Sequence, residues 1–123
     1  MIVIYTSSGS SSCRKAKQYM EDNHLEYIEK NISKKPLKED EIRYLLKRSA
    51  NGTDDIISKR SKVIQENDVN IEEMPLNQLI HFVIDNPTVL KRPIILDNKN
   101  LQIGYDADQM SLFSRNNTVL SFT

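Results

Sequence analysis

Cys13 is the only cysteine of the chain, and it ends the sequence Ser10-Ser11-Ser12-Cys13, which follows the apolar run of residues 2–5. A loop of small residues between a strand and a helix directs its side chains toward the helix N-terminus, whose free N–H groups favour a thiolate or an oxyanion. A redox protein would carry Cys-x-x-Cys here, because two thiols at this spacing form a reversible disulfide. Ser10 has no sulfur, so this chain cannot close that ring.

Two interpretations of Cys13 remain open. The first is a small apolar residue that packs in the first turn of a helix, as free cysteines often do. The second is a thiol of lowered pKa at a helix N-terminus, close to Arg14 and Lys15, which forms a mixed disulfide with a small thiol.

Other kinds of catalytic or metal site have no support in the sequence. His24 and His81 are far apart and have no cysteine or second histidine at ligand spacing, so we predict no metal and no cofactor. Glycine-rich phosphate loops, Ser-His-Asp order and paired carboxylates are also missing.

The elements that position Cys13 form a βαβ unit at the start of the chain. Residues 2–5 are predicted as a buried strand, residues 13–23 as a helix capped by Ser11 or Ser12, and residues 25–32 as a second strand. Near the other end, residues 94–96 and 101–104 predict a hairpin, which a helix over residues 107–113 follows. Open α/β sheets place their sites at the loop after the first strand.

The middle of the chain is predicted to be helical. A helix begins at Pro36 and ends at Asn51-Gly52, where a left-handed cap suits glycine. Thr53 starts a short helix with acids in its first turn. Residues 76–84 then carry an apolar stripe at helical spacing, which we assign to the core.

Length and composition indicate one α/β domain in the cytoplasm. A chain of 123 residues is too short for two ordinary domains. We divide it into a sheet-bearing part, residues 1–32 and 88–114, a helical lobe, residues 33–87, and a tail, residues 115–123. No apolar run approaches the ~20 residues that span a membrane, and a lone cysteine fits a reducing compartment.

Charge is balanced overall but unevenly distributed along the chain. Residues 30–62 hold ten Lys or Arg against five Asp or Glu, whereas residues 64–86 hold five acids and no Lys or Arg. One interpretation is a solvated helix surface, and the other is a docking surface for a charged partner. Without a helix-turn-helix or interleaved aromatic residues, we expect no autonomous binding to DNA.

Five blocks of sequence together resemble the Spx family of transcriptional regulators, which belongs with the arsenate-reductase-like thioredoxin folds. The blocks occur in family order over nearly the whole chain, at residues 5–7, 10–16, 52–62, 91–97 and 101–105. The resemblance implies a thioredoxin-like mixed sheet with an inserted helical lobe. It also implies a regulator of thiol and oxidative stress that binds the C-terminal domain of the RNA polymerase α subunit and meets promoter DNA only within the polymerase complex.

The resemblance assigns roles to particular residues. A disulfide at the positions of Ser10 and Cys13 tunes activity in the family, and Gly52 lies in the surface that contacts the polymerase. Lys47 lies just over one turn before Gly52, near enough to meet an acidic partner. Arg60 and Arg92 match basic positions that cradle an oxyanion in the related arsenate reductases. For these arginines, surface salt bridges and an anion or oxidised-thiol pocket both remain open.

Two functions of different class follow. The first is a monomeric binding protein that docks on the polymerase α domain and catalyses nothing. The second is a one-cysteine thiol oxidoreductase of the arsenate type, which would use Cys13, Arg60 and Arg92. The resemblance places the reductase's catalytic cysteine at Ser10, so the nucleophile is missing and we favour the first function.

Overall fold

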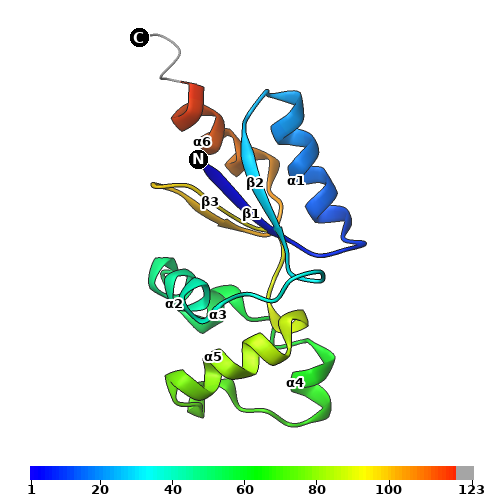
Figure 1. The fold of residues 1–123 in the computed structure, drawn as a ribbon, viewed down its shortest axis with the longest axis vertical. Coiled ribbons are helices and arrows are strands. Elements are labelled where there is room, and N and C mark those ends of the chain that lie inside the picture. Colours follow the sequence, from blue (N-terminus) through cyan, green and yellow to red (C-terminus); the bar gives the residue numbers. More distant parts are fainter. Residues whose placement is uncertain (119–123) are drawn as a thin grey trace. The chain divides into compact units, whose positions relative to one another are not determined.

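The computed structural model describes the chain from residue 1 to residue 118, with its side chains up to Ser114. Along the chain the elements are β1 (Ile2–Thr6), α1 (Ser11–Asp22), β2 (Tyr27–Asn31), α2 (Glu39–Arg48), α3 (Thr53–Ile56), α4 (Lys62–Glu66), η1 (Ile71–Glu73), α5 (Leu76–Asp85), η2 (Pro87–Val89), β3 (Ile94–Leu96), β4 (Leu101–Ile103) and α6 (Ala107–Thr118) (Figure 1). None of the described helices is long and apolar enough to cross a bilayer.

The chain forms two compact units. The first unit holds Met1–Asn31 and the chain from Arg92 on, and the second unit holds Ile32–Lys91. The helical lobe was predicted to cover residues 33–87. The first unit is built on a four-stranded sheet in the order β2-β1-β3-β4. β1 runs parallel to β2 and antiparallel to β3, and β3 pairs with β4 as a hairpin. The predicted βαβ unit, hairpin and mixed sheet are confirmed.

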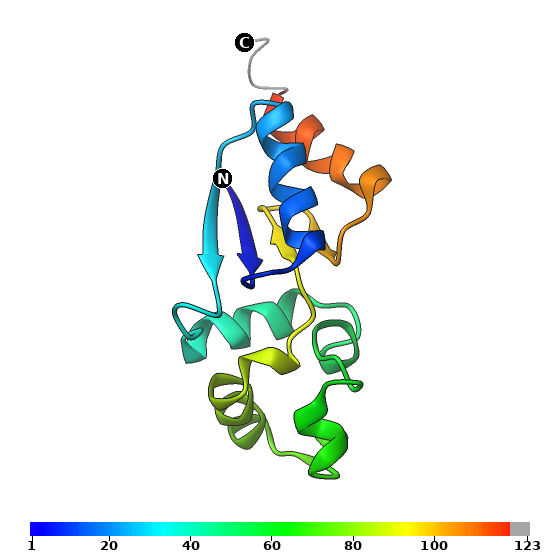
Figure 2. The ribbon, with the colours of Figure 1, turned by 90° about the vertical axis from the view of Figure 1, so that its right-hand side faces the viewer.

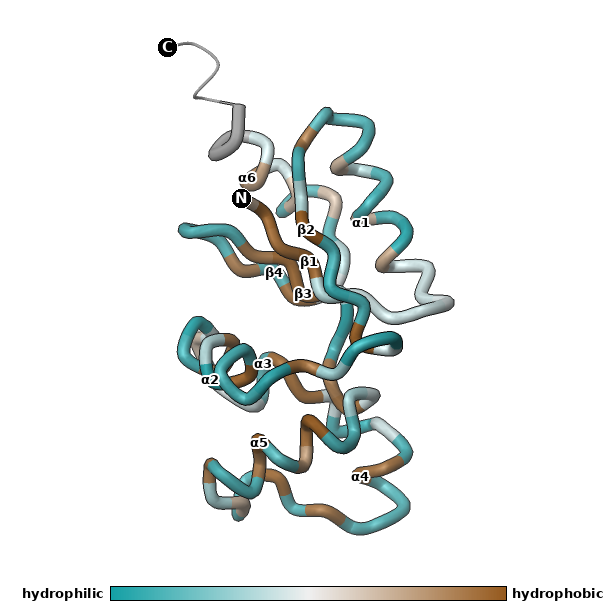
Figure 3. Tube along the Cα trace, in the orientation of Figure 1, coloured by the Kyte–Doolittle hydropathy of each residue, from teal (hydrophilic) through white to brown (hydrophobic). Residues whose placement is uncertain are grey.

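Helices α1 and α6 cover one face of this sheet. The buried cluster there joins strand residues to residues of both helices: Ile2, Ile4, Ile95, Ala16, Met20, Met110 and Phe113. β1 lies directly beside β2 and is followed by the loop that leads into α1 (Figure 2). β3 and the first residues of β1 are hydrophobic (Figure 3), and side chains on both faces of these two central strands are largely buried.

The last helix is longer than predicted. We expected it to end at residue 113, but α6 continues to Thr118, because no glycine or proline interrupts this stretch. The predicted tail therefore begins within a helix, and its residues 119–123 lie outside the described residues.

The second unit is helical, and α2 packs against α5. Ile42 and Leu45 of α2 and Leu79, Ile80 and Val83 of α5 are its buried residues on these helices. Two details of the prediction were wrong. α2 begins at Glu39 rather than at Pro36, and the backbone N–H of Lys38 donates a capping hydrogen bond of 3.1 Å to the Glu41 carboxylate. Leu76 is 50% exposed, because it starts α5 at the rim of the core.

Candidate functional site

The loop between β1 and α1 brings Ser10 and Cys13 together. Ser10 has an extended backbone just before α1, and its hydroxyl oxygen accepts a hydrogen bond of 3.3 Å from the backbone N–H of Cys13. It is therefore the N-cap of the helix. The prediction of a cap at Ser11 or Ser12 was wrong, because both already have helical backbones and cannot reach back to the free N–H groups.

Cys13 lies inside the first unit. Its side chain is 2% exposed and shares the buried face of α1 with Ala16 and Met20. This burial favours the packing interpretation over a reactive thiol, because a solvent thiol can reach a buried sulfur only after local opening.

The sequence analysis missed a group of polar contacts near the loop between β1 and α1. The Thr6 hydroxyl, at the end of β1, donates a hydrogen bond of 2.7 Å to the Glu29 carboxylate on β2. Lys17, one turn after Cys13 on α1, forms a 3.1 Å ion pair with the same carboxylate. Glu29 thus ties β1, β2 and α1 together. Thr6 and Lys17 are 23 and 12 residues away from Glu29 in the sequence, so no local sequence pattern predicts these contacts.

Gly52 lies in the second unit, in the loop between α2 and α3. Its φ of +58° and ψ of −123° are unfavourable for residues with a side chain, and an added Cβ would meet no atom within 4 Å. The predicted left-handed C-cap of α2 was wrong. Ser49 ends that helix instead, since its hydroxyl and backbone N–H both donate to the Leu45 carbonyl, and Gly52 precedes α3.

The Gly52 loop is held by an acid on α3. Asp55 accepts hydrogen bonds from the backbone N–H of Asn51 at 2.9 Å and from its side-chain amide at 3.3 Å. These bonds lower the pKa of the Asp55 carboxyl below its ordinary value of 3.8. The charged carboxylate is therefore the form that holds the loop.

We expect the Asp55 interaction to make stability depend on acid pH. Because the pKa is lowered in the folded state, the stabilisation is present above the unfolded value near 3.8 and is lost as pH falls through the folded value. Urea unfolding of the protein and of Asp55→Asn should differ most near neutral pH, and the difference should shrink below about pH 4. An equal difference at pH 7 and pH 3 would contradict this role.

A lysine secures the other side of α3. Lys59 forms ion pairs with Asp54 at 3.0 Å and with Glu72 of η1 at 2.8 Å. Lys91 adds a hydrogen bond of 3.1 Å to the Asp54 carbonyl. Helix α3, which follows the Gly52 loop, is thus held by contacts of Lys59 and Lys91 with Asp54.

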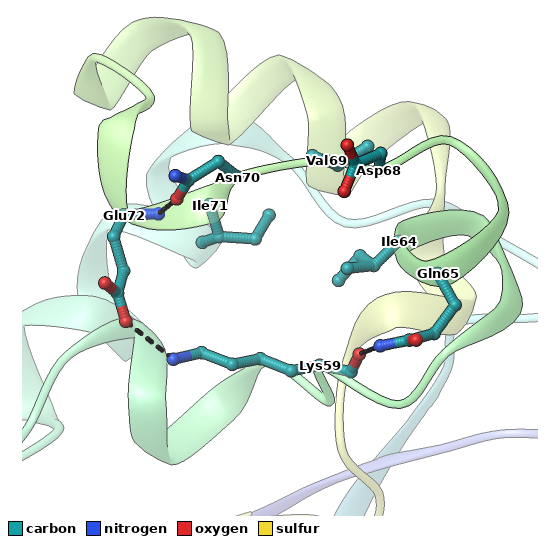
Figure 4. Close-up of a pocket in the computed structure, with 8 residues that line it drawn as sticks. All are labelled: Lys59, Ile64, Gln65, Asp68, Val69, Asn70, Ile71 and Glu72. Carbon is teal, nitrogen blue, oxygen red and sulfur yellow. Dashed lines mark hydrogen bonds and ion pairs between the residues drawn. The ribbon is translucent and has the colours of Figure 1, made fainter.

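Lys59 and Glu72 also line a cavity of about 330 Å³ beside α4 and η1, whose apolar lining comes from Ile64, Val69 and Ile71 (Figure 4).

The exposed end of α2 leads into the same loop. Lys47 is exposed and lies one residue before the end of the helix. Arg48 stacks over the ring of Tyr44, with 5.5 Å between the guanidinium carbon and the ring centre, and donates a hydrogen bond of 2.8 Å to its hydroxyl. The sequence analysis identified Lys47 but missed this pair.

Arg60 and Arg92 belong to different units. Arg60 is exposed in the segment after α3, and Arg92 is partly exposed just before β3, joined to Pro93 by a cis peptide bond. Neither forms a salt bridge with a residue that the structure describes. Their joint action in an anion pocket stays a prediction. Among the described residues, no group of three His, Cys, Asp or Glu side chains is arranged to hold a metal ion.

Sequence comparison matches the chain to one protein family and to named transcriptional regulators. The pattern of the ArsC family matches residues 5–113. The global transcriptional regulator Spx 1 of Bacillus cereus is 47% identical over 92% of this chain and 86% of its own length. The regulators named Spx from Bacillus subtilis and Staphylococcus aureus are 45% and 46% identical over the same shares.

Structural comparison gives the same fold at lower sequence identity. A putative arsenate reductase from Yersinia pestis superposes with a TM-score of 0.80 at 18% identity, over 91% of this chain and 99% of the other. A possible arsenate reductase from Streptococcus mutans gives 0.76 at 21% identity, over 90% and 98%. The predicted arsenate-reductase-like fold is confirmed.

Proposed function

This chain belongs to the ArsC family and, within it, to the Spx transcriptional regulators, and on this premise we propose that it binds the C-terminal domain of the RNA polymerase α subunit. It acts as a monomer in the cytoplasm and meets promoter DNA only within the polymerase complex. The observation that carries the proposal is 45–47% identity to named Spx regulators over 92% of the chain.

The Gly52 loop supports this assignment of a docking surface. An added Cβ at Gly52 would contact nothing within the chain, so internal packing does not require glycine there. Only the backbone conformation does, and the open space over Gly52 is available to a partner. Lys47, close to it in sequence, adds a positive charge that suits an acidic face.

The proposed function does not include regulation by an internal disulfide. Cys13 is the only cysteine, and the position three residues before it holds Ser10 as a helix cap. Thiol oxidation in this protein is therefore limited to an adduct or an oxyacid on Cys13, or to a Cys13-linked dimer.

Binding to the isolated α domain tests the proposal. Titration calorimetry with the purified domain should give a saturable 1:1 heat that weakens as salt concentration rises, because the proposed contact includes charged groups. Absence of binding at high micromolar concentrations of both proteins would refute it.

An enzyme assay tests the alternative. A one-cysteine arsenate reductase requires a reactive thiol, but Cys13 is 2% exposed and the family's nucleophile position holds serine. We expect no arsenate reduction with glutathione or thioredoxin above that of Cys13→Ala. Turnover above that control would establish the reductase.

A further inference from the structure

We propose that the cavity beside α4 and η1 binds a small organic cation on a short apolar stem, of the alkylguanidinium or alkylammonium class. The cavity has a volume of about 330 Å³ and lies within the second unit. Ligand pockets range over about 300–1,000 Å³, so this one suits a small ligand. The proposed function uses none of its lining residues, and the inference therefore goes beyond that function.

The apolar side of the cavity offers a surface for the stem of such a ligand. It is formed by Ile64, Val69 and Ile71. Ile64 and Ile71 are 6% and 4% exposed, so they belong to the packed core of the second unit and present a firm surface. The alkyl stems of lysine and arginine cover apolar surface in the same way while their charged ends stay in water.

Contacts among the lining residues hold the walls of the cavity. The Lys59 ammonium pairs with Glu72 at 2.8 Å, and the Gln65 side-chain amide donates a hydrogen bond of 2.7 Å to the Lys59 carbonyl. The Asn70 side-chain oxygen accepts a hydrogen bond of 3.1 Å from the backbone N–H of Glu72 (Figure 4). A ligand that enters a cavity with such walls has fewer side chains to order on binding.

Asp68 is the charged lining group that has no counter-ion. Its side chain is exposed, and no hydrogen bond or ion pair joins it to a residue that the structure describes. Lys59 is the only cation of the lining, and it is already paired with Asp54 and Glu72. Figure 4 shows Asp68 across the cavity from the Lys59–Glu72 pair. The surplus negative charge attracts a cation and repels an anion.

The surrounding sequence does not supply the missing cation. Residues 64–86 hold five acids and no Lys or Arg, which is the charge run for which a docking role stayed open. A guanidinium or ammonium group brought by a ligand can donate charge-assisted hydrogen bonds to Asp68 while its stem contacts the apolar side. The cavity thus combines the two contacts that an amphipathic cation requires.

A solvated turn is the alternative explanation. Asp68 has a φ of +50°, and aspartate is among the residue types that adopt this conformation most readily, so the turn can require it without any ligand. In that case small molecules of either charge would bind equally weakly, and the Asp68 carboxylate would not affect their affinity. The test therefore varies the charge and the stem of the ligand separately.

NMR titration of the full-length protein with n-butylguanidinium tests the proposal. At constant ionic strength, backbone amide signals of residues 64–72 should shift and saturate with a dissociation constant on the order of millimolar, as the size of this ligand allows. Pentanoate has the same butyl stem and the opposite charge, whereas guanidinium alone has no stem. Each of these two compounds should bind at least about fivefold more weakly.

The matched variants change one negative charge at a time. Asp68→Asn removes the charge and keeps the turn, because asparagine also adopts positive φ. It should raise the dissociation constant of n-butylguanidinium at least about threefold. The control is Glu66→Gln, which removes an exposed acid of α4 that does not line the cavity, and its affinity should change less than about 1.5-fold. Urea unfolding of both variants verifies that the fold is kept.

Three results would each overturn the site. They are the absence of saturable shifts at residues 64–72, equal binding of pentanoate, and unchanged affinity of a folded Asp68→Asn variant. The capped peptide acetyl-Gly-Arg-Gly-amide distinguishes two sources of the cation within a supported site. Binding as tight as that of n-butylguanidinium indicates a protein side chain, and weaker binding indicates a free small molecule. The polymerase α domain takes no part in this experiment, so its failure leaves the proposed function standing.

Discussion

Gly52→Arg is expected to abolish measurable binding to the polymerase α domain, raising the dissociation constant at least about a hundredfold while the protein stays folded. The reason lies in two observations on the free chain. Polar contacts hold the loop on both sides of Gly52: Asp55 accepts a hydrogen bond from the backbone N–H of Asn51, and Lys59 pairs with Asp54. The space over Gly52 is open within the chain, so a new side chain projects into it, where the proposed partner lies.

The backbone cost of this substitution requires its own control. Any side chain at φ +58° and ψ −123° strains the loop, by about 1–3 kcal/mol for such rare conformations. Gly52→Ala carries this strain without the bulk, because its Cβ meets nothing within 4 Å. The alanine variant should therefore lose similar stability but less than about tenfold in affinity. The difference in affinity between Gly52→Arg and Gly52→Ala measures the effect of the side-chain clash with the partner.

A second control matches charge and bulk at another site. Gly9 also has a positive φ, of +78°, and open space around an added Cβ, but it lies in the loop of the first unit. Gly9→Arg should bind the α domain as the unsubstituted protein does. If Gly52→Arg does not fold, Lys47→Glu reverses one charge on the helix without backbone strain and should still weaken binding at least about tenfold. A folded Gly52→Arg of unchanged affinity would move the interface elsewhere.

The sheet and the main helices were predictable because their signals are local. Alternation and apolar runs mark β1 and the β3–β4 hairpin, and the stripe of α5 repeats at helical spacing. Element ends were less predictable. Ser10, Ser11 and Ser12 are equivalent as cap residues in sequence, and only the backbone at Ser10 decides which one accepts the Cys13 N–H.

The candidate site was predictable only where its residues carry a local sequence signal. The need for glycine at position 52 was clear from its place between two helical segments, but its role as the start of α3 depended on Ser49 ending α2 first. The Tyr44–Arg48 and Asn51–Asp55 pairs have four-residue spacing, which is a signal that the sequence analysis did not use. The bonds of Glu29 and of Lys59 with Glu72 join distant segments, so only the fold reveals them.

Ser10→Cys is expected to restore a disulfide and with it a response to oxidants. The Ser10 side chain already points to the start of α1, since its oxygen lies 3.3 Å from the Cys13 backbone nitrogen. A sulfur at this position lies in the same turn as the Cys13 sulfur, as in Cys-x-x-Cys sites. Treatment with diamide should then lower the intact mass by two hydrogens, measured under non-reducing conditions.

The matched variant for this experiment is Ser10→Ala. It removes the cap and should lose about 1 kcal/mol of unfolding free energy, but it should show no loss of two hydrogens. The unsubstituted protein should likewise show only an adduct, an oxyacid or an intermolecular dimer at Cys13. Its affinity for the α domain should not change through any internal bridge, whereas oxidation of Ser10→Cys should change that affinity.

Two results would contradict this account of position 10. One is failure of folded Ser10→Cys to form the bridge under conditions in which the unfolded variant forms it, because the loop would then hold the two sulfurs apart. The other is a strong effect of oxidants on α-domain binding by the unsubstituted protein without any modification of Cys13. That result would place redox sensing in another residue, since the chain has no second sulfur with which Cys13 can close a ring.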